Sequence, residues 1–269
     1  MPEAPANGRC VHCLRLSELI TADHVFPNSW YPDTTPPTVQ RWTVPSCPEC
    51  NRELGQLEKD LLIRFILCVN PKSLAASGLA SKALRSLGLD TDGLSEKEKA
   101  HRDKQRTKIR SELMPSAELA GKPGAIPGLG PHGDKSALWS IPIPWAGLSI
   151  VAEKIVCGCE YKLRKRFVEK PYGISTFIDS SGFVPEPYAS HAQLLDFGPG
   201  CSVRRVFATE DPNMALYWIS VWGTLYLGAR IGLADELPKL DQSASRAQGM
   251  VPNENSKTMR ISPYLRNQP

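Results

Sequence analysis

Two pairs of cysteines with the same spacing lie near the start of this 269-residue chain. Cys10 and Cys13 form one pair, Cys47 and Cys50 form the other, and two residues separate the members of each. Each pair can form a knuckle that presents two sulfurs to one side, and four sulfurs complete the tetrahedral shell of a structural zinc ion. The spacing therefore predicts one closed zinc site. The alternatives are two unrelated thiol pairs or redox motifs.

An acid, an imidazole and an amide lie inside or beside this cysteine frame. Asp23 and His24 are adjacent, and Asn51 directly follows the last cysteine. A histidine can activate water because its pKa lies near neutral pH, and a carboxylate can hold a divalent ion that stabilises charge on a phosphate. These residue types indicate a metal-dependent phosphodiesterase. His24 also fits a structural or surface position, and Asn51 also fits a helix N-cap.

A hairpin followed by a helix would position these groups. We expect a first strand within residues 14–25, a proline-rich loop, and a return strand over residues 41–45. Residues 51–66 are expected to form a helix, since apolar residues recur there near helical spacing. Those residues are Leu54, Leu57, Leu61, Leu62 and Phe65. We expect this zinc module to occupy residues 1–70.

Three segments together resemble the HNH endonuclease family, in its zinc-bearing ββα-metal (treble-clef) branch. They are Cys10-Val-His-Cys13, Asp23-His24-Val25-Phe26-Pro27 and Cys47-Pro-Glu-Cys50-Asn51, and they cover about the first quarter of the chain. The resemblance implies a β-hairpin and a helix stapled by zinc. It also implies a separate catalytic ion, Mg or Mn.

The resemblance also implies roles for individual residues. His24 matches the general base, Asp23 matches the acid that holds the catalytic ion, and Asn51 matches an asparagine that binds the metal or shapes the site. Glu58 lies seven residues after Asn51, two turns along one helix face. We expect Glu58 to be a second acidic ligand, with Asp60 as the substitute. The alternative for Glu58 is a solvated helix face, since a lysine follows it.

The sequence departs from the family pattern in two places. The family often has an asparagine on the return strand, but residues 41–46 contain no amide side chain. Leu54 and Gly55 replace the basic or histidine residue that is common shortly after Asn51. Either Asn51 and Glu58 compensate for these differences, or the module is catalytically silent.

These observations lead to one expected function and two alternatives. We expect a metal-dependent endonuclease that hydrolyses phosphodiester bonds in DNA. The first alternative is a catalytically inactive, zinc-stapled module that binds nucleic acid. The second is a structural zinc domain that serves protein contacts. The sequence carries no signal for DNA over RNA, for sequence preference, for biological role or for oligomeric state.

The rest of the chain divides by composition, and the expected fold class is α+β. After the zinc module we expect a basic helical segment, a linker rich in proline and glycine, a C-terminal α+β domain of unknown role and a disordered tail. These segments cover residues 71–114, 115–145, 146–235 and 236–269. Expected helices cover residues 74–87, 92–114 and 148–165. Residues 216–227 are expected to form one strand, with a buried helix as the alternative.

The net charge and the unpaired cysteines indicate which partners and which compartment the protein has. The net charge of +4 permits binding to nucleic acid without requiring it. The basic stretches at 96–110 and 162–167 fit either a surface laced with ion pairs or contacts with phosphate. No apolar run is long enough to span a bilayer, and residues 1–5 do not resemble a signal peptide. Together with unpaired cysteines, these features predict a cytoplasmic protein without membrane contacts.

Overall fold

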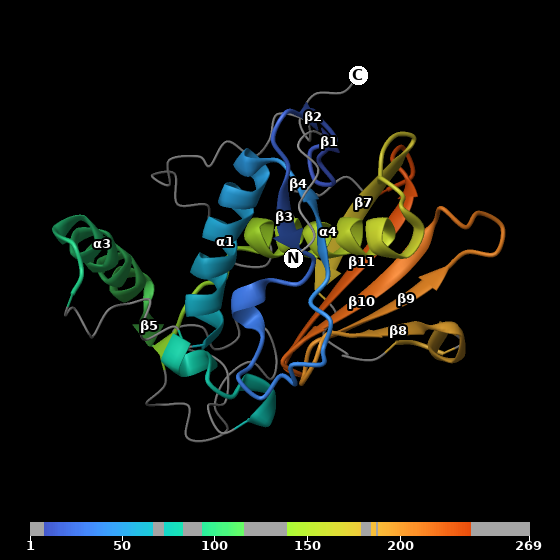
Figure 1. Cartoon of the computed structure of the whole chain (residues 1–269). Coiled ribbons are helices and arrows are strands. Elements are labelled where there is room, and N and C mark those ends of the chain that lie inside the picture. The colour runs from blue at the N-terminus through green and yellow to red at the C-terminus, as the bar shows by residue number, and fades with distance from the viewer. Residues whose placement is uncertain are drawn as a thin grey trace.

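The structure is a computed structural model that describes residues 8–66, 73–82, 93–115, 139–178, 184–186 and 188–237. Long helices and an antiparallel sheet occupy separate parts of the chain (Figure 1), which confirms the predicted α+β class. None of the helices in these ranges is both long and apolar enough to cross a membrane.

The zinc module forms a hairpin and a helix, as predicted. Strand β3 (Thr21–His24) pairs antiparallel with β4 (Thr43–Ser46), and helix α1 (Pro48–Ile66) follows β4 almost directly. Two further short strands, β1 (Gly8–Arg9) and β2 (Leu16–Ser17), flank the first cysteine pair. The expected strand over residues 14–25 is therefore two short strands.

Helix α1 begins earlier than expected. It starts at Pro48, and proline is favoured in the first turn because its missing N–H has no partner there. Asn51 consequently lies inside the helix, where its backbone N–H donates to the carbonyl of Cys47 at 3.0 Å. The reading of Asn51 as an N-cap is wrong.

The C-terminal part contains a five-stranded antiparallel sheet with the order β7-β11-β10-β9-β8. Its strands are β7 (Tyr172–Ile178), β8 (Gln193–Asp196), β9 (Ser202–Phe207), β10 (Ala215–Val221) and β11 (Leu225–Leu233). The expected single strand over residues 216–227 is wrong, because a tight turn divides it. Trp222 and Gly223 have positive φ angles of 53° and 65°, as the central residues of a type I′ hairpin turn require.

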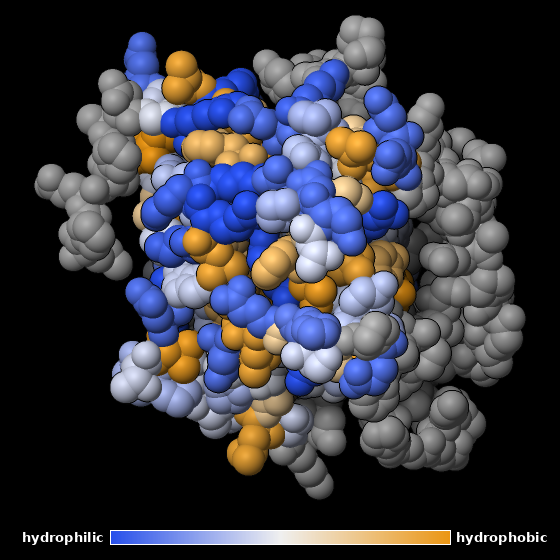
Figure 2. Space-filling view, turned by 90° about the vertical axis from the view of Figure 1, so that its right-hand side faces the viewer, coloured by the Kyte–Doolittle hydropathy of each residue, from blue (hydrophilic) through white to orange (hydrophobic). Residues whose placement is uncertain are grey.

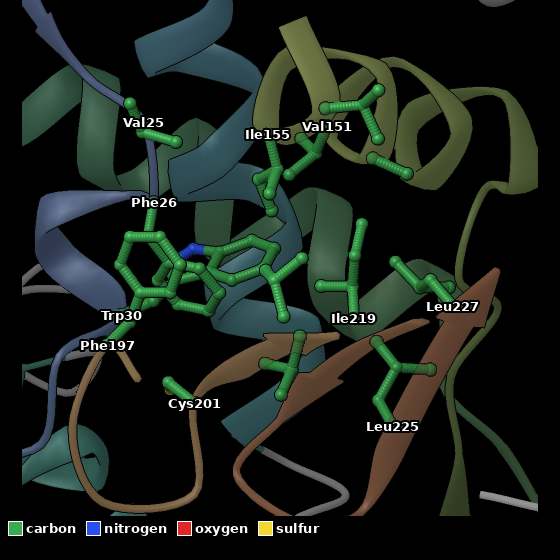
Figure 3. Packing of buried hydrophobic residues seen from close by; sticks show 14 of the residues in the cluster. Val25, Phe26, Trp30, Val151, Ile155, Phe197, Cys201, Ile219, Leu225 and Leu227 are labelled. Carbon is green, nitrogen blue, oxygen red and sulfur yellow. The ribbon is translucent and has the colours of Figure 1, made fainter. Parts of the chain in front are cut away.

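Helix α4 (Trp145–Arg164) lies between the zinc module and the sheet (Figure 1). One side of it packs on the sheet, where Val151 and Ile155 face Ile219 and Leu227 (Figure 3). The same side also meets the zinc module, so closely that a Cβ atom on Gly158, two turns along from Val151, would lie 2.8 Å from the side chain of Val25. Helix α4 therefore connects the two halves of the molecule.

One hydrophobic core runs through both halves. It contains Val25, Phe26 and Trp30 of the zinc module together with Ile219 and Leu227 of the sheet. The 3-10 turn η1 (Asn28–Trp30) contributes directly, because the carbonyl of Trp30 accepts a hydrogen bond from the indole of Trp222 at 2.7 Å. The predicted domain boundaries stay predictions, but the zinc module and the C-terminal unit share this core.

The middle of the chain attaches to α1. Helix α3 (Glu96–Glu112) begins with a capping box formed by Ser95 and Glu98. Arg64 of α1 pairs with Glu112 of α3. The remaining short elements are β5 (Met114–Pro115), which pairs with β6 (Trp139–Ser140), and the 3-10 turns η2 (Leu74–Ala76) and η5 (Tyr188–His191). Most of the predicted linker, the end of the helix predicted over 74–87 and nearly all of the predicted tail lie outside the described residues.

Figure 2 shows the surface of the described residues on the side that carries the sheet. Hydrophobic residues are scattered there among hydrophilic ones (Figure 2). Large exposed hydrophobic side chains of this sheet are Phe177, Leu194 and Phe207.

Two glycine substitutions test the packing of α4 against the zinc module. Gly158→Ala should lower the free energy of unfolding by about 1–3 kcal/mol, because the new methyl group meets Val25 in a filled core. Gly55→Ala in α1 is the matched control, since nothing lies within 4 Å of its added Cβ. It should raise the free energy of unfolding by about 0.5–1 kcal/mol. Urea denaturation measures both, and equal effects would contradict the close approach.

Candidate functional site

The four predicted zinc ligands come together. The sulfur atoms of Cys10, Cys13, Cys47 and Cys50 all lie within 4.8 Å of one another, and those of Cys13 and Cys47 are 3.8 Å apart. A zinc tetrahedron with bonds of about 2.3 Å has sulfur–sulfur edges of about 3.8 Å. The cluster is therefore compatible with one structural zinc ion and brings both knuckles to a single point.

The surroundings of the first cysteine pair suit thiolate ligands. The hydrogen bond from Cys50, opposed by burial and assisted by backbone N–H groups, lowers the pKa of Cys10 to about 3. The guanidinium of Arg15 donates to the sulfur of Cys13 at 3.4 Å. The first knuckle turns tightly, with Leu14 at a positive φ of 63°. The contacts of Cys10 and Cys13 stabilise negative charge on sulfur, whereas burial raises the pKa of Cys47 and the hydrogen bond with Cys10 raises the pKa of Cys50.

Asp23 lies inside the molecule, beside the zinc frame. Its carboxylate accepts a hydrogen bond from Lys154 at 2.9 Å on one oxygen and contacts the Nε2 atom of His12 at 2.9 Å on the other. Burial acts to raise the pKa of Asp23, but the His12 hydrogen bond and the positive charge of Lys154 outweigh it and hold that pKa below its ordinary value. Asp23 is therefore ionised, and each of its carboxylate oxygens contacts a partner.

Glu58 reaches the same point from α1. Its carboxylate also accepts a hydrogen bond from the ammonium of Lys154, and its side chain is 10% exposed. Burial raises the pKa of Glu58 above its ordinary value in spite of Lys154. Asp60 points elsewhere and pairs with Arg64 and Lys108. Of the two acids considered, Glu58 is the one that converges with Asp23.

The interpretation of the sequence missed Lys154. It comes from α4, lies 131 residues from Asp23 and 96 from Glu58 in the sequence, and is 1% exposed. Its position gave one signal: a charged residue interrupts the buried stripe of α4, between Val151 and Ile155. A buried lysine needs a partner of opposite charge, so such an interruption indicates an acid on a neighbouring element.

His24 follows Asp23 on β3. Neighbouring residues of a strand point to opposite faces, so His24 leaves the strand on the other side from Asp23 and is half-buried. Burial, with the positive charges of Lys154 and Arg41, lowers the pKa of His24 below its ordinary value despite the nearby Asp23. The imidazole is therefore neutral at pH 7 and able to accept a proton.

Asn51 links two elements of the zinc module. Its side-chain amide donates to the hydroxyl of Thr21 at 2.9 Å, and that hydroxyl donates to the carbonyl of Ser46 at 3.0 Å. This chain of bonds holds α1 to the start of β3 and the end of β4. Asn51 thus shapes the frame that carries Asp23.

The described part of the chain contains one group of three or more histidine, cysteine or acidic side chains able to hold a metal, and it consists of the four cysteines. Asp23, His24 and Glu58 do not form such a group, because the ammonium of Lys154 lies between the two carboxylates. A site for Mg or Mn therefore stays a prediction.

Many basic side chains of the two basic stretches form ion pairs within the molecule. In and beside α3, Lys99 pairs with Glu96 and Lys108 pairs with Asp60. After α4, Arg166 pairs with Glu160 at 3.2 Å. These contacts favour the reading of both stretches as surfaces laced with ion pairs. Contact with phosphate stays a prediction.

A cavity of about 690 Å³ lies away from the carboxylate cluster. The sheet register places Val206, Leu216 and Arg230 in one row across its wall, and η5 adds Tyr188. None of the predicted site residues lines it. The candidate chemistry therefore lies with Asp23, Glu58, Lys154 and His24.

Comparisons of the chain with protein-family models, curated proteins and solved structures found no match. The function must therefore be inferred from the residues and their geometry.

Removal of one cluster cysteine tests the zinc site. Cys47→Ser should reduce bound zinc from one ion per chain to a small fraction and lower the melting temperature, because a structural zinc contributes directly to folding free energy. Cys157→Ser is the matched control, since Cys157 lies outside the cluster. Elemental analysis and thermal melts report the result. One zinc retained in Cys47→Ser would contradict the predicted ligand set.

Proposed function

We propose that this chain is an HNH-type endonuclease that hydrolyses phosphodiester bonds in DNA. One observation carries the proposal: Asp23 of β3 and Glu58 of α1 converge on a single cation position. His24 follows Asp23 on β3, near enough for the positive charge of Lys154 to lower its pKa. The hairpin, the helix and the cysteine cluster supply the frame that such a module needs. Glu58 was predicted as the second acid from its helix face and from the family resemblance, and its meeting with Asp23 supports the same interpretation.

The residues suit distinct parts of the reaction. His24 is neutral at pH 7 and can take a proton from the attacking water. Asp23 and Glu58 already surround a positive charge, so their geometry fits a cation. A divalent ion such as Mg or Mn, held there, would stabilise the charge that develops on the phosphate. Asn51 keeps the helix and the hairpin in register through Thr21.

The surrounding properties are compatible with this activity. The chain carries a net charge of +4, which favours association with a polyanion. All cysteines in the described ranges are free, which fits a reducing compartment such as the cytoplasm. DNA as substrate rests on the resemblance of the zinc module to HNH nucleases.

A second candidate function is a catalytically inactive, zinc-stapled module that binds nucleic acid. Lys154 favours it, because its ammonium already neutralises the two acids that would hold the catalytic ion. The return strand, β4, also lacks the asparagine that the family often has there. Under this alternative the hairpin, the helix and the cysteine cluster serve nucleic-acid binding alone, and His24 does not act as a general base.

A nicking assay separates the two functions. Supercoiled plasmid is incubated with wild type, His24→Ala and His101→Ala, each with equal zinc content, in magnesium and in manganese. We expect metal-dependent nicking that falls by about 10²–10⁴-fold in His24→Ala, because general-base catalysis contributes that much. His101 is exposed on α3 and serves as the histidine control, so its variant should cut like wild type.

Binding measurements decide the remaining outcomes. No cutting by any of the three proteins, with zinc bound and salt-dependent DNA binding retained, would contradict the nuclease and favour the silent binding module. Loss of both cutting and binding at low salt would leave a structural zinc domain.

A further inference from the structure

A single ammonium group occupies the point where the two acids meet. Lys154 donates to Asp23 and to Glu58, and the three side chains are 1%, 7% and 10% exposed. Oxygens of two carboxylates around one positive charge form the kind of environment that hard divalent cations also prefer. A lysine ammonium and a divalent ion therefore need the same oxygens.

The remaining oxygen of Asp23 is not free either. His12, between the two cysteines of the first knuckle, contacts it at 2.9 Å, and the His12 side chain is 9% exposed. The other ring nitrogen of His12, Nδ1, is buried and has no hydrogen-bond partner among the described residues. An ion that reached Asp23 would therefore have to replace Lys154, because His12 holds the opposite side.

The fold fixes Lys154 in this place. Gly158 lies one turn further along α4, on the same face, and its backbone packs directly against Val25 at the end of β3. That contact holds α4 against the strand that carries Asp23. The packing of α4 therefore fixes the ammonium of Lys154 next to the two carboxylates. Lys154 is not a flexible lysine on the surface.

We propose that Lys154 is an internal counterion that keeps the Asp23–Glu58 site assembled without metal and competes with a divalent ion for it. Lys154 is thus a positioning residue: it holds the two carboxylates together, and an ion binds only when the ammonium leaves. The inference rests on the proposed function for the identity of the ion, Mg or Mn.

Manganese titration of zinc-loaded protein, followed by electron paramagnetic resonance, tests the competition without DNA. Lys154→Met keeps the length of the side chain and removes its charge. We expect this variant to bind one Mn²⁺ roughly tenfold or more tightly than wild type, a common size for coupling between two binding events. Glu58→Gln in the Lys154→Met background is the control, and it should abolish the gain.

Thermal stability provides a second readout. Lys154→Met leaves two buried carboxylates without their counterion, so its melting temperature should fall and should recover when MnCl₂ is added. At the same MnCl₂ concentration, wild type should show a smaller shift in melting temperature, because Lys154 competes with the ion. Lys154→Gln, which removes the charge but keeps a donor, should behave in the same way. If neither variant folds in metal-free buffer, refolding with MnCl₂ should restore the folded protein.

The opposite results would overturn the proposal. They are a Lys154→Met affinity for Mn²⁺ no higher than that of wild type, a gain that persists with Glu58→Gln, or unfolded variants that MnCl₂ does not rescue. The nicking assay is independent of these results. A protein that never cuts DNA can still show the competition, and an active nuclease can still lack it.

Discussion

The contact of Lys154 with Asp23 and Glu58 joins the three elements on which the rest of the structure depends. Lys154 comes from α4, Asp23 from β3 and Glu58 from α1, and none of these elements is adjacent to another in the sequence. Burying charges is costly unless they are paired, so the three elements must pack against one another before pairing can offset the cost of burying the charges. Removing one partner of such a group leaves an uncompensated charge and typically costs about 3–5 kcal/mol. The ion cluster therefore links the zinc module to the C-terminal unit in addition to the core.

The cysteine cluster provides the second anchor. It fixes the first knuckle, which carries His12, against the start of α1, which carries the second knuckle. Because His12 contacts Asp23, the zinc frame and the ion cluster are neighbours that share one acid. Metal occupancy at the cysteines is thus expected to influence the position of Asp23. Phe26, Trp30 and Trp222 belong to the shared core, and the indole of Trp30 donates to the backbone carbonyl of Glu58 at 3.1 Å.

The features that the sequence predicted correctly are those determined by short-range spacing. The spacing of Cys10 and Cys13 is enough to predict a knuckle. The apolar spacing of α1 predicts a helix, and that helix places Glu58 on the same face as Asn51. Features that depend on distant packing were not predictable in this way. The partner of Asp23 and Glu58 lies far along the chain, and only the fold shows that the buried stripe of α4 meets the zinc module.

Local backbone conformation explains the other differences. The turn between β10 and β11 contains Trp222 at a positive φ, which a bulky residue rarely adopts, so an unbroken strand was the expected reading of residues 216–227. Buried and half-buried residues alternate along β10, whereas in β11 Gly228 and Gly232 are buried as well and interrupt the alternation.

Anomalous diffraction from crystals of the zinc-loaded protein grown with manganese tests the central claim most directly. The account predicts a zinc peak among the four cysteine sulfurs and a manganese peak between Asp23 and Glu58, with the ammonium of Lys154 displaced from both carboxylates. A structure in which Lys154 keeps both contacts and manganese binds elsewhere, or not at all, would contradict the assignment of these two acids to a cation site.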